Sequence, residues 1–279
     1  MKIRLIVDST TEIMPEYKDR VHVVPLTVFF GEKSYVDGVD IDHNTFYQKL
    51  IESDVLPTTS QPNPLDFAKE YEEAKKNNEA CIVIALPAKL SGTYQSATIA
   101  AQDYDNVYVI DSGSVAIGTA ILVELALRYI DQGLDVKTVV EKIEEEKKKV
   151  IIIALVDTLE YLHKGGRLSK SVTVAGAVLN IKPVLSVIDG NINAIGKAMG
   201  SKRGNNMLSQ EIEKAGGVDF TKPVLLGYTG ISNALLLKYI EDSRPLWEND
   251  LENLRYSTIG SVIGTHAGPG AIAVAFFKK

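Results

Sequence analysis

The residues best suited to bind or react with a ligand are hydroxyl side chains and one histidine, in segments rich in glycine and proline. Segment 58–62 reads Thr-Thr-Ser-Gln-Pro, segment 90–94 reads Leu-Ser-Gly-Thr-Tyr, and His266 lies in Gly-Thr-His-Ala-Gly-Pro-Gly at 264–270. Hydroxyl donors and the free N–H groups at a helix start can hold a carboxylate or a phosphate. A histidine can donate to such an anion or transfer a proton near neutral pH. These segments indicate either an anion-binding site or a hydrolytic site.

The enzymatic alternative is a lipid or ester hydrolase with Ser91 as nucleophile, His266 as base and one of several aspartates as third member. Ser91 does not lie in the Gly-x-Ser-x-Gly turn that exposes such a nucleophile. A serine ahead of Gly-Thr at the start of a predicted helix is also an ordinary N-cap, which accepts a hydrogen bond from the first turn. A small-molecule binder of α/β type is a further alternative.

Two glycine-rich segments do not fit the nucleotide-binding motifs that they superficially match. Segment 190–198 has five residues between its glycines where a phosphate-binding loop has four, and Ala198 stands where Ser or Thr would bind magnesium. Segment 268–273 leaves no room for the helix that must follow a dinucleotide-binding turn. We therefore expect no ATP-binding loop in this chain.

We also expect no metal, no cofactor and no disulfide. Cys81 is the only cysteine, and His22, His43, His163 and His266 are too widely separated to show the spacing of metal ligands.

Charge and composition indicate a cytoplasmic globular protein. The 30 Lys and Arg against 36 Asp and Glu give a net charge of −6, so we expect no nucleic-acid partner. The three apolar residues before Asp8 are too few for a secretory signal. Glu124 and Arg128 interrupt the longest apolar segment, 115–130, which predicts a buried helix and no stable membrane insertion.

The first half of the chain alternates predicted strands with predicted helices. We expect strands at 3–7, 21–30, 81–86 and 107–110, and helices after Asp42, after Asn63, and at 92–104, 115–130 and 135–149. This alternation favours a parallel sheet with helices on its faces. An all-apolar run from 150 to 156 then starts a second series, so that we expect domains at 1–149 and 150–279.

The second half predicts an α/β domain with a mixed sheet. Asp189-Gly190 predicts a hairpin between strands 182–188 and 191–195. We further expect strands at 223–228, 254–259 and 271–277 and helices at 170–179, 207–215 and 232–247. Segment 264–270 is expected to be a loop.

Seven segments together resemble the DegV family in order and spacing, over essentially the whole chain. They are 7–10 (Val-Asp-Ser-Thr), 58–62, 90–94, 109–112 (Val-Ile-Asp-Ser), 159–169 (which contains His-Lys-Gly-Gly-Arg), 180–184 (Asn-Ile-Lys-Pro-Val) and 264–270.

The resemblance implies a two-domain α/β protein that holds a single long-chain fatty acid in an apolar tunnel. Bacterial members of this family are the acyl-binding subunit of fatty acid kinase and present the carboxylate to a separate ATP-dependent kinase subunit. By the resemblance, Thr59 and Ser91 anchor the carboxylate, and His266 and Thr265 lie beside them. This implies a carrier and no enzyme, because phosphoryl transfer then needs another polypeptide.

Further residues follow from the same resemblance and from the charge pattern. Ser60, Gly92 and Thr93 are expected as secondary ligand contacts. A basic group is expected to face the kinase partner or its phosphate: Lys164, Arg167, Lys170, Lys197, Lys202 and Arg203. Met199 stands where the family often has an arginine, so the pattern favours lipid binding more strongly than it favours kinase docking.

Overall fold

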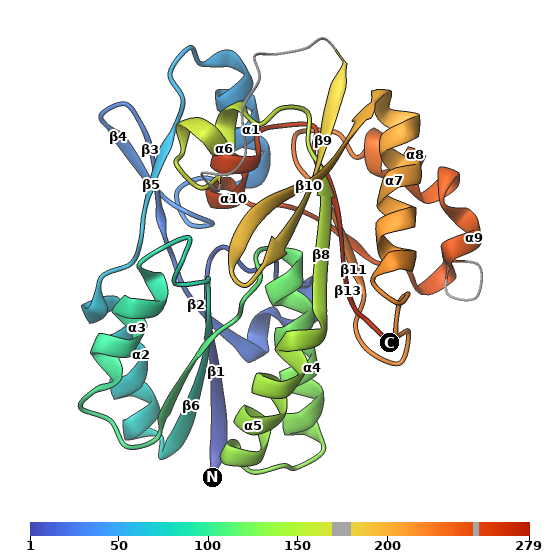
Figure 1. Ribbon diagram of the computed structural model, residues 1–279. Coiled ribbons are helices and arrows are strands. Elements are labelled where there is room, and N and C mark those ends of the chain that lie inside the picture. Colours follow the sequence, from blue (N-terminus) through green and yellow to red (C-terminus); the bar gives the residue numbers. More distant parts are fainter. Residues whose placement is uncertain (169–179, 248–250) are drawn as a thin grey trace.

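Two larger β-sheets, one from each half of the chain, and a small third sheet form the framework of the computed structural model (Figure 1). It describes residues 1–168, 180–247 and 251–279. The helix expected at 170–179 lies outside these residues. The strands of the two larger sheets fall on either side of residue 150, the predicted domain boundary.

The first sheet is parallel and has helices on both faces, as predicted. Its strands, in spatial order, are β2 (Val21–Val24), β1 (Lys2–Asp8), β6 (Glu79–Ala85) and β7 (Val107–Asp111). Helices α2 (Pro64–Lys76) and α3 (Thr93–Ala101) pack on one face, and α4 (Ile117–Asp131) and α5 (Val136–Glu146) on the other. β1 is apolar from Leu5 to Val7 and β6 from Ala80 to Ala85, because both faces of this sheet are buried there.

The second sheet is mixed, also as predicted. Its strands, in spatial order, are β10 (Asn191–Met199), β9 (Ile181–Ile188), β8 (Val150–Leu155), β13 (Ile272–Phe277), β11 (Leu225–Tyr228) and β12 (Tyr256–Thr258), of which only β11 and β12 pair in parallel. Asp189 and Gly190 both have positive φ, as the tight hairpin between β9 and β10 requires. Helices α7 (Gly200–Lys214) and α8 (Ala234–Asp242) cover the outer face.

Helix α4 lies between the two large sheets. Its side chains share one hydrophobic core with strands of the first sheet and with β8, β11 and β13 of the second. This explains why the helix is apolar on all sides. Its one buried carboxylate, Glu124, accepts hydrogen bonds from Arg128 at 2.9 Å and from Arg255 at 2.6 Å.

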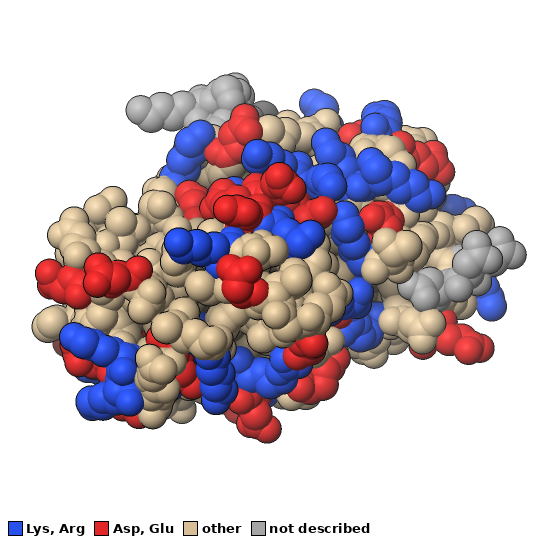
Figure 2. Space-filling view, turned by 90° about the horizontal axis from the view of Figure 1, so that it is seen from below, with Lys and Arg blue, Asp and Glu red and all other residues tan. Residues whose placement is uncertain are grey.

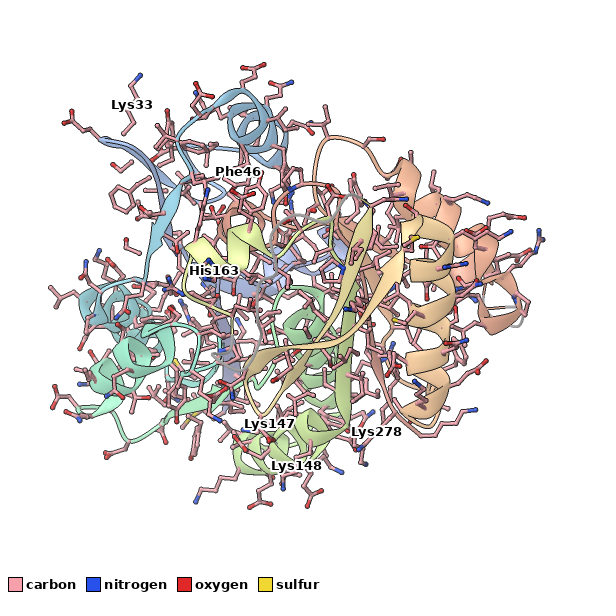
Figure 3. The ribbon with its side chains drawn as sticks, turned by 45° about the horizontal axis from the view of Figure 1, so that its top comes forward. Lys33, Phe46, Lys147, Lys148, His163 and Lys278 are labelled. Atoms are coloured by element: carbon pink, nitrogen blue, oxygen red, sulfur yellow. The ribbon has the colours of Figure 1, made fainter. Side chains whose placement is uncertain are left out.

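The third sheet differs from the prediction and carries part of the site. The expected strand at 21–30 is two strands, because Pro25, which has no N–H, separates β2 from β3 (Thr27–Phe30). β3 pairs on one side with β4 (Lys33–Val36), which begins at Lys33 just after the turn (Figure 3), and on the other with β5 (Thr58–Ser60).

Three helices lie together beside this small sheet: α1 (His43–Glu52), α6 (Glu160–Lys164) and α10 (Ser261–Ala267) (Figure 1). The loop expected at 264–270 is therefore helical over its first part. Phe46 points from α1 into the interior, where it is fully buried (Figure 3).

One helix of the second half is divided in two. The helix expected at 232–247 breaks into α8 and α9 (Arg244–Trp247), because Pro245 cannot donate the hydrogen bond that would continue it. Short 3-10 turns complete the described structure: η1 (Pro15–Arg20), η2 (Lys147–Lys149) and η3 (Leu251–Asn253). No helix within the described ranges is long and apolar enough to cross a bilayer. On the face in Figure 2, basic and acidic side chains are interspersed with uncharged ones.

Candidate functional site

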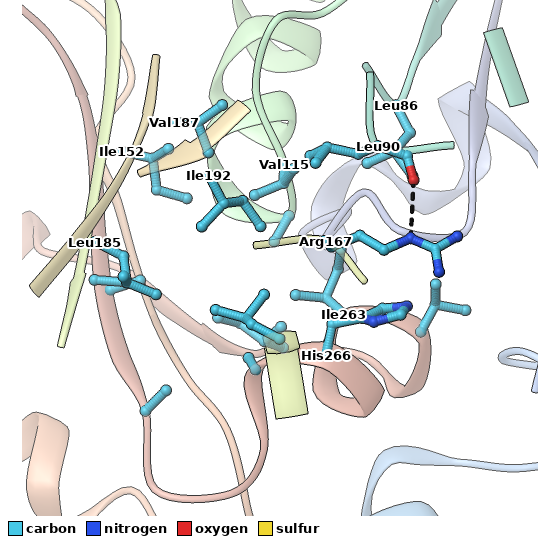
Figure 4. Close-up of a pocket in the computed structure, with 18 of the residues that line it drawn as sticks. Leu86, Leu90, Val115, Ile152, Arg167, Leu185, Val187, Ile192, Ile263 and His266 are labelled. Carbon is cyan, nitrogen blue, oxygen red and sulfur yellow. Dashed lines mark hydrogen bonds between the residues drawn. The ribbon is translucent and has the colours of Figure 1, made fainter. Parts of the chain in front are cut away.

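An apolar cavity of about 370 Å³ lies among β5, the two residues before α4, helix α10 and the inner face of the second sheet. Its walls are mainly Leu, Ile, Val and Ala side chains, among them Val115, Ile152, Leu185, Val187 and Ile192 (Figure 4). A cavity of about 150 Å³ holds the six carbons of benzene, which is about 25 Å³ per carbon. By this measure the cavity accommodates about fifteen carbon-sized groups.

Most of the polar groups of the wall come from three short segments and α10, apart from Ser186 on β9 and Thr229 after β11. Thr59, Ser91, Arg167 and His266 line the cavity, and Ser60 and Gln61 line it beside them. In Figure 4, Arg167 and His266 lie at the end opposite Ile152. No carboxylate is among the described residues that line the cavity. The site is thus a long apolar volume with hydrogen-bond donors and one cation at its head.

Thr59 reaches the cavity because segment 58–60 is a strand. This strand, β5, pairs with β3, and Val28 is the residue opposite Thr59. Alternation along the strand exposes Thr58 and turns Thr59 inward. The Thr59 hydroxyl lies 3.2 Å from His266 Nε2.

Ser91 is held at the start of α3. The helix begins at Thr93, with Gly92 rather than Ser91 at the N-cap position, which corrects the predicted cap. The Ser91 Oγ nevertheless accepts a hydrogen bond from the Thr93 amide at 3.3 Å and lies 2.9 Å from the Thr93 hydroxyl. Thr93 is fully buried and acts behind Ser91, outside the cavity wall.

Helix α10 presents His266. Val262, Ile263, His266 and Ala267 all line the cavity, a spacing that places them on one side of the helix. Gly264 lies on the side that meets α1, where an added Cβ would stand 2.5 Å from the Tyr47 hydroxyl, so that only glycine allows this approach.

Two residues from the first half of the chain fix the start of α10. The Glu12 carboxyl accepts a hydrogen bond from the Gly260 amide at 2.6 Å, and the Tyr47 hydroxyl donates to the Ile259 carbonyl at 2.8 Å. Burial raises the pKa of Glu12 to about 8, an effect that nearby Asp37 increases. Glu12 is therefore mostly protonated at neutral pH.

His266 is neutral at physiological pH. Burial, and then the positive charge of Arg167, lower its pKa to about 4. Its Nδ1 is buried and has no hydrogen-bond partner among the described residues. That nitrogen faces Gly165, where an added Cβ would lie 2.3 Å away. The glycine of the Gly-Gly-Arg turn thus makes room for the imidazole ring.

Arg167 connects the two loops at the head of the cavity. Its Nε donates to the Leu90 carbonyl at 3.2 Å, next to Ser91 (Figure 4). Its Nη1 donates to the Gly165 carbonyl at 2.7 Å. We expected Arg167 on a partner-facing surface; its side chain lies in the wall of the cavity.

Other predicted residues lie elsewhere. The Thr265 hydroxyl donates to the Ser261 carbonyl of its own helix at 2.9 Å and does not line the cavity. Gly92 is likewise absent from the wall. Lys197 lies on β10, and Lys202 and Arg203 lie in the first turn of α7, all outside the cavity wall. Lys164 pairs with Glu160 on α6, whereas Lys170 lies outside the described residues.

The geometry does not form a catalytic triad. Ser91 is hydrogen bonded to Thr93 and His266 to Thr59, so the described side chains lack the direct bond between nucleophile and base that a triad uses. Within residues 1–168, 180–247 and 251–279, no group of three or more His, Cys, Asp or Glu is placed to hold a metal ion.

Sequence reasoning missed Gln61 and most of the apolar wall. Gln61 belongs to the Thr-Ser-Gln-Pro segment, and its side chain lines the cavity and also reaches α3. The presence of this polar residue in the same short motif as Thr59 was the available signal. The apolar wall gave no comparable signal, because a leucine facing a cavity resembles one facing a core.

The sequence of this chain matches a family model and related proteins over essentially its full length. The family model described as "Uncharacterised protein, DegV family" matches residues 2–279. A DegV domain-containing protein of Caldanaerobacter subterraneus subsp. tengcongensis is 35% identical over 285 residues, which are 100% of this chain and 99% of that protein.

Solved structures show the same fold. A DegV family protein from Thermus thermophilus, described by its fatty acid binding, has a TM-score of 0.90 at 29% identity, with 100% of both chains covered. A stearic acid-binding protein from Eubacterium ventriosum has a TM-score of 0.84 at 26% identity, with 100% of this chain and 99% of that one covered. With the family model matching nearly every residue, this chain belongs to the DegV family.

Proposed function

We propose that this protein binds a single long-chain fatty acid, with the tail in the apolar cavity and the carboxylate at Thr59 and Ser91. The observation that carries the proposal is the chemistry of one cavity, whose wall is mainly apolar and which has the Thr59 and Ser91 hydroxyls and Arg167 in its lining. The fatty-acid binding of the similar proteins from Thermus and Eubacterium supports it.

The tail supplies most of the binding free energy. Each methylene removed from water contributes about 0.8 kcal/mol, so about fourteen methylenes contribute on the order of 11 kcal/mol before the cost of ordering. The cavity has room for about fifteen carbon-sized groups, which fits a chain of this length. A short polar ligand would leave most of this apolar wall without contacts.

The head is held by neutral hydroxyl donors with a cation behind them. We assign the ring proton of His266 to Nε2, because the alternative would bury an unpaired N–H at Nδ1 near Arg167. His266 then donates to Thr59, and the Thr59 hydroxyl is free to donate to the carboxylate. Hydroxyl anchoring, unlike a bidentate arginine pair, leaves carboxylate lone pairs available for reaction.

The finer part of the proposal is that the bound acid is presented to a separate ATP-dependent kinase. A carboxylate oxygen would attack the γ-phosphorus of ATP, the bond to the β-phosphate oxygen would break, and acyl phosphate and ADP would form. Ser60 and Gln61 are exposed at the head, so a partner could approach this end. The glycine-rich segment 190–198 lies in the hairpin strand β10 and supplies no phosphate-binding loop.

Mass spectrometry after denaturing extraction tests the binding proposal. We expect about one acyl chain per protein molecule. Thr59→Ala and Ser91→Ala should each weaken the affinity of the delipidated protein for palmitate by about tenfold or more, since one hydrogen bond to a charged group contributes about 1.5 kcal/mol or more. Thr58→Ala, which removes the same group from the exposed side of β5, is the matched control. An extract without lipid, together with no binding on titration, would refute the proposal.

The kinase role needs its own measurement. Purified protein with palmitate and ATP should form no acyl hydroxamate after treatment with hydroxylamine. Addition of an extract from host cells that lack this protein should produce it, and the same extract alone should not. Acyl hydroxamate from the purified protein alone would show that the chain is itself the kinase.

A further inference from the structure

The Gln61 side chain spans the two segments that carry the proposed anchors. It follows β5, two residues after Thr59, and its Nε2 donates to the Ser96 hydroxyl of α3 at 3.1 Å. Gln61 is itself exposed, whereas Ser96 is only 2% exposed. An exposed glutamine is thus tied to a buried hydroxyl in the helix that Ser91 precedes.

The backbone at Gly92 lies in close contact with the Gln61 side chain. A Cβ built at Gly92 would stand 2.0 Å from Gln61 Oε1 and 2.5 Å from both Cδ and Nε2. The whole amide group therefore lies against the backbone between Ser91 and Thr93. Because Ser91 Oγ accepts its hydrogen bond from the Thr93 amide, a shift at Gly92 would redirect the Ser91 hydroxyl.

Thr59 is also connected to this amide through a short backbone link. The strand β5 ends at Ser60, and Gln61 is the next residue. The side chain and the main chain of Gln61 thus link the Thr59 hydroxyl to the Ser91 loop. A second connection lies farther from the two hydroxyls: α2, which begins three residues after Gln61, packs on α3, and its Tyr71 hydroxyl donates to the Ala97 carbonyl.

We infer that Gln61 is a positioning residue that sets the separation and direction of the Thr59 and Ser91 hydroxyls and so gives the site its preference for a carboxylate. This inference rests on the proposed fatty-acid binding and adds the residue that makes it selective. Gln61 acts through Ser96 and Gly92, and the apolar tail does not depend on it. The preference for an acid over an alcohol of equal length should therefore change while tail binding does not.

The test compares palmitate with 1-hexadecanol, titrated into the delipidated protein. Gln61→Ala should lower the ratio of the palmitate affinity to the hexadecanol affinity about tenfold, with hexadecanol affinity within twofold of wild type. Ser96→Ala keeps the glutamine at 61 but removes the hydroxyl that accepts its hydrogen bond. This variant should lower the same affinity ratio at least threefold. Gln95→Ala, an exposed glutamine one residue before Ser96, is the matched control and should leave the ratio unchanged.

The outcomes separate this inference from the proposal beneath it. If wild-type protein prefers palmitate and both the Gln61→Ala and Ser96→Ala variants keep that preference, the positioning role is refuted and fatty-acid binding stands. A parallel loss of palmitate and hexadecanol affinity also refutes it, because it shows a general structural role. Failure of the wild-type protein to bind palmitate refutes the proposed function itself.

Discussion

A larger side chain at Ile152 should shorten the fatty acid that the protein binds. Ile152 lies on β8 at the end of the cavity opposite Arg167 and is 6% exposed (Figure 4). Ile152→Trp adds six heavy atoms, which fill about 150 Å³ at about 25 Å³ per atom. The remaining volume of about 220 Å³ holds about nine carbon-sized groups, where the wild type holds about fifteen.

The loss of affinity follows from the methylenes that no longer fit. About six methylenes at about 0.8 kcal/mol each come to about 5 kcal/mol, or a few thousandfold in affinity for palmitate. Octanoate, which needs only the head half of the cavity, should bind within threefold of wild type. The smaller Ile152→Phe adds three heavy atoms and should give an intermediate limit of about twelve groups.

Calorimetric titration with saturated acids of increasing length measures this limit. In wild type, affinity should rise with each methylene up to about fifteen carbon-sized groups, and in Ile152→Trp the rise should end near nine. Ile151→Trp makes the same kind of change on the opposite face of β8, toward the other core, and is the matched control. Thermal unfolding checks that each variant folds. An unchanged rise through palmitate in folded Ile152→Trp would show that the tail does not occupy this cavity.

Three further predictions concern groups in and around α10. Glu12 has a pKa of about 8 in the folded protein, above its ordinary value of 4.5, so the folded state binds the extra proton and stability is lost as pH rises from about 4.5 to 8. Glu12→Gln keeps the acceptor for the Gly260 amide. Its free energy of unfolding in urea should exceed that of wild type by a few kcal/mol at pH 8 and differ little from it at pH 5. Equal free energies of unfolding at pH 8 would contradict this. The lowered pKa of His266, about 4, predicts that its NMR resonances stay constant from pH 8 to 6, and that its contribution to stability is lost only as pH falls below 6.5 toward 4; a midpoint near 6.5 would exclude the buried neutral ring. Gly165→Ala would place a Cβ 2.3 Å from His266 Nδ1 and should weaken palmitate binding at least tenfold in calorimetry, whereas unaltered affinity would show that the ring position does not matter.

The position of the two proposed anchors in the cavity wall could be predicted from sequence because each lies in a short contiguous motif. Thr59 and Ser91 were both expected at the site, and both line the cavity. Their local structure was less predictable. β5 is three residues long and pairs with a strand thirty residues earlier, so no local periodicity marks it. A pattern of alternation needs about four residues or more before it indicates a strand.

Helix α10 could not be predicted because its sequence favours a loop. Glycine in a helix costs about 1 kcal/mol relative to alanine, and segment 264–270 contains three glycines and a proline. The helix forms because Gly264 lets it pack closely on Phe46 and Tyr47, residues more than two hundred positions away. Long-range packing of this kind outweighs the local propensity.

The cavity itself is the feature that sequence could least specify, because both halves of the chain build it. The second half supplies walls from β8, β9, β13 and α10, and the first half supplies β5, the Ser91 loop and the residues just before α4. Arg167 joins the halves at the head through the Leu90 carbonyl, next to Ser91. A ligand that fills the cavity contacts both halves, so its binding must stabilise their association by the free energy of binding to the joined form. The affinity for a ligand in the cavity and the free energy that holds the two halves together are therefore thermodynamically linked. A substitution at Arg167 should change both.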